Sequence, residues 1–166
     1  ATFKMRQVYF TLSERIVLIP MEFLPALKWF MLILLVFTGL HVLATGSVSQ
    51  DLMISFIPYF AAVLIGSVLV PVLLPWIPFR SFALKGGFVS VLFLVFWHMN
   101  VETDGHILWV HLLLLPALAS YLALNFTGTT PLTSLSGVQK ELNIGIPFFI
   151  TAAVLGIVIK TVYLFI

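Results

Sequence analysis

Residues 53–76 read MISFIPYFAAVLIGSVLVPVLLPW, an apolar stretch that contains no charged side chain. About 20 apolar residues suffice for a helix to cross the hydrocarbon core of a bilayer. Only helices and closed barrels satisfy their backbone groups in lipid. The apolar residues here are continuous and do not alternate with polar ones, which favours a helix over a barrel strand. The stretch therefore predicts a transmembrane helix.

The composition extends this prediction to the whole chain. Of its 166 residues, 61% are hydrophobic and only 8% are charged, whereas a soluble domain carries roughly 25% charged residues. The absence of cysteine excludes disulfides, thiolate metal sites, ligated iron–sulfur clusters and a cysteine nucleophile within this chain. A net charge of +2 is too small to indicate nucleic acid as a partner. We predict an all-α integral membrane protein.

Five apolar runs define the expected spans, and a mixed segment precedes them. Within residues 1–25, Thr11 and Glu14 fit a capping box, which predicts a short interfacial helix over residues 12–19 that Pro20 and Pro25 end. A five-helix transmembrane domain follows over residues 26–166. Its spans are expected at about 26–44, 53–76, 82–101, 106–126 and 144–166. Pro71, Pro75 and Pro78 predict a bent or unwound end of the second span.

The distribution of basic residues predicts the orientation. Seven of the eight fall on one side of the five-span arrangement: Lys4, Arg6, Arg15, Lys28, Arg80, Lys85 and Lys140. The links on the other side carry Asp51, Glu102 and Asp104 but no Lys or Arg. The positive-inside rule therefore places the amino terminus in the cytoplasm. Lys160, late in the last span, can extend to the outer surface.

The link between the fourth and fifth spans is the most unusual candidate for a binding site. It combines hydroxyl side chains and glycines, which let backbone N–H groups converge on an anionic or oxygen-rich ligand. Its candidate residues are Asn125, Thr127, Gly128, Thr129, Thr133, Ser134, Ser136, Lys140 and Glu141. The alternative is a loop that only caps helices, since Ser136 and Gln139 form a second capping-box pattern. Arg80 and Lys85 in the other basic link could bind lipid phosphate, a cofactor phosphate or an acidic partner.

Four histidines lie toward the opposite side. His98, Glu102 and His106 are weak candidates for a metal site, with His98 and Glu102 one helical turn apart, and His41 and His111 are nearby in the topology. Histidine is also a common axial ligand of haem, so a haem site is an alternative interpretation. The spacings match no standard metal pattern, so ordinary interfacial histidines are the simpler interpretation.

Three segments on the predicted cytoplasmic side carry a family resemblance. They are FTLSERIVLIPME (10–22), LPWIPFRSFALKG (74–86) and NFTGTTPLTSLSGVQKE (125–141). Together they resemble the carboxy-terminal membrane domain of HgcA, the corrinoid protein of the mercury-methylating pair. The resemblance runs over essentially the whole chain, and it implies a five-helix membrane domain in the inner (cytoplasmic) membrane of a bacterium or archaeon.

The resemblance also implies a function and partners. In that family a soluble corrinoid-binding domain carries a methyl group on cobalt and passes it to Hg(II). A ferredoxin-like partner with iron–sulfur (4Fe–4S) clusters returns the cobalt to its reduced state. The family's defining cysteine lies in the soluble domain and is absent here, so this chain is either a fragment or a separate homologue that docks a soluble protein. It is not expected to be catalytic alone.

The hypothesis is therefore a membrane anchor and docking platform. The platform consists of Arg15, Arg80, Lys85 and Lys140 together with the hydroxyl-rich link. Two alternatives remain open: a permeation domain for a small solute or Hg(II), and a haem-binding membrane anchor.

Overall fold

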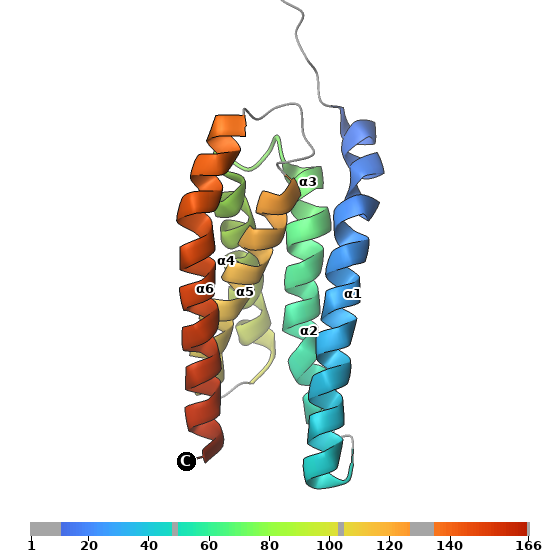
Figure 1. The fold of residues 1–166 in the computed structure, drawn as a ribbon, viewed down its shortest axis with the longest axis vertical. Coiled ribbons are helices and arrows are strands. Elements are labelled where there is room, and N and C mark those ends of the chain that lie inside the picture. Colours follow the sequence, from blue (N-terminus) through green and yellow to red (C-terminus); the bar gives the residue numbers. More distant parts are fainter. Residues whose placement is uncertain (1–10, 48–49, 103–104, 127–134, 166) are drawn as a thin grey trace, which may run out of the picture.

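The computed structural model describes residues 11–47, 50–102, 105–126 and 135–165, and these are helical apart from short connections. The elements are α1 (Leu12–Thr45), α2 (Gln50–Leu64), the π-helical turn η1 (Ile65–Leu69), α3 (Val70–Leu73), α4 (Phe82–Asn100), α5 (Gly105–Asn125) and α6 (Leu135–Phe165). Figure 1 shows them as an elongated bundle, with α2, η1 and α3 forming one column. Within these described ranges, five helices are long and apolar enough to cross a membrane, which confirms the predicted number.

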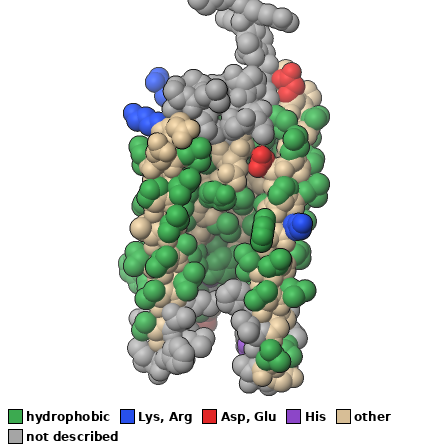
Figure 2. Space-filling view, in the orientation of Figure 1, with side chains coloured by type: hydrophobic (Ala, Val, Ile, Leu, Met, Phe, Trp, Pro, Cys, Tyr) green, Lys and Arg blue, Asp and Glu red, His purple; other side chains and the backbone are tan. Residues whose placement is uncertain are grey.

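Helix α5 occupies the middle of the bundle. It packs against α4 and α6 on one side and against α2 and η1 on the other, and α1 packs mainly against the α2–η1–α3 column (Figure 1). Of the five spanning helices, α5 buries the largest share of its side chains and α1 the smallest. The outer surface is largely hydrophobic in Figure 2, as expected for helices that face lipid.

Helix α1 corrects the prediction of a separate interfacial helix. The capping box is confirmed, because the Thr11 N–H donates to Glu14 Oε2 at 2.8 Å. The helix then continues through Pro20 and Pro25 to Thr45, over 34 residues. Each proline removes one backbone hydrogen bond. Both proline rings are exposed on the outside of α1, and the residues around them remain helical. Neither proline therefore ends the helix.

The second span is irregular where prolines were expected to disturb it. The Val70 N–H donates to the Ile65 carbonyl, an i→i−5 bond that defines the π-helical turn just before Pro71. The helix ends at Leu73, so Pro75 and Pro78 lie beyond it. The predicted irregularity at the end of the second span is thus confirmed. Pro116, by contrast, lies within α5 and does not interrupt that helix.

The start of α6 corrects the predicted link between the last two spans. The sequence predicted a link to residue 143, but α6 begins at Leu135. Residues 135–143 include Gln139, Lys140 and Glu141, which lower the local hydropathy although all three are good helix formers. The backbone of Ser136 consequently lies in the first turn of α6.

Small residues bring the central helices into direct contact. A Cβ added at Gly66 of η1 would lie 2.6 Å from the Ala119 carbonyl oxygen of α5, and one added at Gly86 of α4 would lie 2.5 Å from the same atom. The α5 backbone at Ala119 is therefore held between two glycines on neighbouring helices. Ser67 and Ser90 are also fully buried in this region. Close backbone approach through small residues is typical of helix packing in membranes.

Candidate functional site at the charged end of the bundle

One end of the bundle gathers the four basic residues predicted to form the docking platform, together with Glu141. Here α1 and α6 begin, α3 and α5 end, and α4 begins (Figure 1). Besides Glu14, which caps the start of α1, the described charged residues at this end are Arg15, Arg80, Lys85, Lys140 and Glu141. We refer to these five residues and the helix termini that carry them as the charged end.

Glu141 of α6 caps the start of α4. Its Oε2 accepts hydrogen bonds from the Phe82 N–H at 3.2 Å and from Ser81 Oγ at 3.1 Å. Ser81 is itself the N-cap of α4, since its Oγ accepts from the Leu84 N–H at 3.4 Å. A carboxylate at a helix amino terminus satisfies an otherwise unpaired N–H and interacts favourably with the helix dipole. Glu141 therefore attaches α6 to α4.

Lys85 of α4 caps the end of α3 in a complementary way. Its Nζ donates to the Leu74 carbonyl at 2.8 Å and lies 5.3 Å from the centre of the Phe82 ring. A cation at a helix carboxy terminus is stabilised by the unpaired carbonyls there. The Lys85 side chain is only 5% exposed, so it holds helices together and does not offer a surface for direct docking. This differs from the sequence-based expectation, in which Lys85 was a contact residue.

Arg15 brings α1 into the same cluster. Lys85 interacts electrostatically with Arg15, which repels it, and with Glu141, which attracts it. Next to these charges, Leu18 packs against an apolar cluster formed by Leu74, Phe82 and Phe126. The structure thus brings together Arg15, Lys85 and Glu141, three predicted site residues from three helices.

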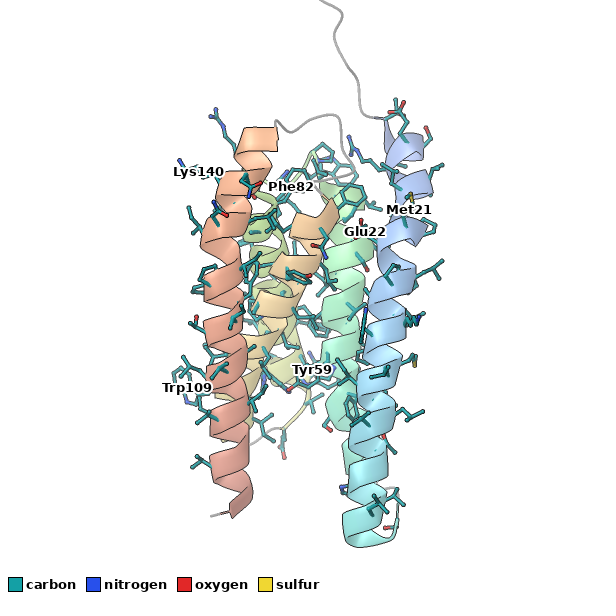
Figure 3. All side chains as sticks on the ribbon, in the orientation of Figure 1. Met21, Glu22, Tyr59, Phe82, Trp109 and Lys140 are labelled. Carbon is teal, nitrogen blue, oxygen red and sulfur yellow. The ribbon has the colours of Figure 1, made fainter. Side chains whose placement is uncertain are left out.

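Arg80 and Lys140 remain exposed at the charged end. Lys140 lines, with Ser81 and Glu141, the polar end of a groove of about 480 Å³ between α4 and α6. Most of that groove is apolar, including Leu84, Phe148 and Phe149. In Figure 3, Lys140 points outward from the start of α6. These two residues are the cations of the predicted platform that a partner could reach directly.

Asn125 is the next predicted site residue that the structure places. Thr127, Gly128, Thr129, Thr133 and Ser134 lie outside the described residues. Asn125, the last residue of α5, is half-buried and lines a different groove, together with Glu22 of α1.

Two of the histidines, His98 and His111, form a pair, whereas the predicted His106 side chain lies outside the part of the chain that the structure describes. His111 Nδ1 lies 3.3 Å from His98 Nε2, and Tyr59 meets the His111 ring edge-on at 5.5 Å between ring centres. Glu102 does not join them, because α4 ends at Asn100 and the backbone at Val101 is extended, which corrects the expected one-turn spacing. No group of three potential metal ligands occurs among the described residues. The two rings also contact each other directly, whereas a bis-histidine haem site places the porphyrin between them.

Comparison with protein-family models, curated proteins and solved structures yields no match to this chain.

Proposed function

We propose that this chain is the membrane domain of a corrinoid-dependent mercury methyltransferase, in which it anchors and docks a soluble corrinoid-binding domain. The charged end is the docking surface and faces the cytoplasm of a bacterium or archaeon. The ferredoxin-like iron–sulfur partner is recruited to the same side. The observation that carries this proposal is the cluster of helix-end contacts made by Lys85 and Glu141, beside which Arg80 and Lys140 stay exposed.

The cluster supports docking because it fixes the positions of helix ends. Glu141 joins α6 to α4, and Lys85 joins α4 to the end of α3. Exposed cations on such a fixed frame can be complementary to an acidic patch on a soluble domain. Charge complementarity of this kind speeds association and selects the partner more than it adds affinity.

The cofactors belong to the partners in this proposal. The chain contains no cysteine, so it offers no thiolates for the iron–sulfur clusters or for Hg(II). The corrinoid supplies the methyl group from the soluble domain, and Hg(II) is the substrate there. The residues of this chain position that domain at the membrane.

Binding of the separately expressed corrinoid domain to this chain in detergent tests the proposal. The double variant Arg80→Gln/Lys140→Gln removes both exposed cations and leaves the buried cluster intact. We expect its affinity to fall about tenfold or more, with the loss mainly in the association rate at low salt. Lys28→Gln is the matched control, because Lys28 is an exposed cation on α1 away from the helix termini. Equal binding by the double variant, or no binding by the folded wild-type chain, would contradict the proposal.

A further inference from the structure

A second groove lies between α1, α2 and α5, away from the groove at Lys140. It has a volume of about 410 Å³. Its lining runs from Glu22 to Ile33 along α1 and from Asn125 to Leu118 along α5, with Val63 of α2 between them. In Figure 3 the Glu22 side chain points from α1 toward the neighbouring helices. Figure 2 shows the front face hollowed between its two outer columns.

The groove has one polar end and one apolar end. Glu22, Asn125 and Tyr121 form the polar end, whereas Phe30, Ile33, Val63 and Leu118 form the apolar end. Asn125 is the last residue of the apolar stretch Ile107–Asn125 that is long enough to cross a membrane. The polar end thus lies level with the end of a spanning segment, where lipid headgroups are found, and the apolar end extends toward the bilayer core.

Among the residues that the structure describes, Glu22 has no polar partner in this groove. Its carboxylate makes no hydrogen bond or ion pair with another residue that the structure describes. Lys28, six residues further along α1, lies about 120° around the helix and is exposed. A half-buried carboxylate without a partner in a spanning helix is costly, and such residues commonly mark binding sites.

We propose that this groove binds a phospholipid with a primary ammonium headgroup, phosphatidylethanolamine. The ammonium group donates to the Glu22 carboxylate and to the Asn125 side-chain oxygen. One acyl chain follows Phe30, Ile33 and Leu118 into the bilayer. The negative charge of Glu22 disfavours an anionic headgroup such as phosphatidylglycerol. A trimethylated headgroup carries the same positive charge but has no N–H to donate.

Native mass spectrometry of the purified chain with defined lipids of identical acyl chains tests this proposal. The wild-type protein is offered phosphatidylethanolamine, its monomethyl and dimethyl derivatives, phosphatidylcholine and phosphatidylglycerol. We expect phosphatidylethanolamine to be retained about tenfold more than phosphatidylcholine or phosphatidylglycerol, the ratio that one charge-assisted hydrogen bond supports. Retention should fall as N–H donors are replaced by methyl groups. If the wild-type protein retained phosphatidylethanolamine, its methylated derivatives and phosphatidylcholine equally, the proposal would be overturned.

A matched pair of variants assigns the preference to Glu22. Glu22→Gln keeps the shape of the side chain and should abolish the preference for phosphatidylethanolamine. Glu102→Gln, at an exposed carboxylate beyond the end of α4, should leave it unchanged. Added phosphatidylethanolamine should also raise the thermal unfolding midpoint of the wild-type protein but not that of Glu22→Gln. If Glu22→Gln retains the full preference, the groove is not the site.

Discussion

Replacing Gly86 by alanine tests whether direct backbone contact holds the bundle together. The new Cβ would lie 2.5 Å from the Ala119 carbonyl oxygen and 2.8 Å from the Ser120 Cα. Ordinary contacts begin at 3.4 Å, so α4 and α5 would have to move apart by about 0.9 Å at this point. Both obstructing atoms belong to the backbone of α5, and no side-chain rotation can relieve the overlap.

The expected loss of stability follows from two opposing effects. Overpacking of this kind costs about 1–3 kcal/mol. Because the obstructing atoms are backbone, the cost lies in the upper part of that range, about 2–3 kcal/mol. The higher helix propensity of alanine offsets up to about 1 kcal/mol of this loss of stability. The net loss of about 1–2 kcal/mol should lower the unfolding midpoint by about 2–8 °C for a chain of this size.

Thermal unfolding in detergent, followed by the fluorescence of the four tryptophans, measures this change. Gly39→Ala is the matched control, because a Cβ at Gly39 of α1 meets nothing within 4 Å and should keep or slightly raise the midpoint. If Gly86→Ala were as stable as the wild type, the close contact between α4 and α5 would not be present in the folded protein.

Three further predictions concern the polar contacts, each measured by the same unfolding assay. Glu141→Ala leaves the amino terminus of α4 without its acceptor and should cost about 1–2 kcal/mol, whereas Glu141→Gln, which keeps an acceptor oxygen, should cost less. Equal losses of stability in the two variants would show that the acceptor oxygen of residue 141 does not stabilise the start of α4. Lys85→Met keeps an apolar stem but leaves the Leu74 carbonyl unpaired, for an expected loss of about 1–3 kcal/mol. An unchanged midpoint would mean that water satisfies that carbonyl. The alanine variants of His98 and His111 should be non-additive by about 0.5–1.5 kcal/mol, since they share one hydrogen bond; strict additivity would contradict the pairing.

Hydropathy was enough to predict the five spans, because a long apolar run in lipid has no alternative to a helix. It failed where helices extend beyond the apolar runs. Pro20 and Pro25 indicated a break in α1, but helix propensities describe exposed segments in water and underestimate helices that lie against lipid and neighbouring helices. At the start of α6, residues 135–143 include polar side chains, so a prediction based on the length of apolar runs missed this part of the helix.

The partners within the charged end could not be predicted from local pattern. Ser81 begins α4 without an acidic residue three positions later, so no capping box marks it. Its acid, Glu141, comes from 60 residues away in sequence. Lys85 resembled a surface cation in the sequence, and only the packing of α3 against α4 shows that it is buried. Glu22 followed Pro20 in a segment expected to lie on the membrane surface, and the continuous α1 instead places it beside α5.

Helix α1 contributes a residue both to the proposed docking surface and to the proposed lipid site. Arg15 and Glu22 are seven residues apart, which is nearly two full turns, so they lie on the same face of the helix. Arg15 belongs to the charged end, and Glu22 belongs to the lipid groove. Of the five helices long enough to span a membrane, α1 has the smallest share of buried residues in its apolar stretch, whereas α4 and α5 are in direct backbone contact at Gly86. A lipid in the groove and a protein at the charged end would both favour the same placement of α1. Because such coupling is reciprocal, docking of the soluble domain should strengthen lipid binding by the same factor by which the lipid strengthens docking.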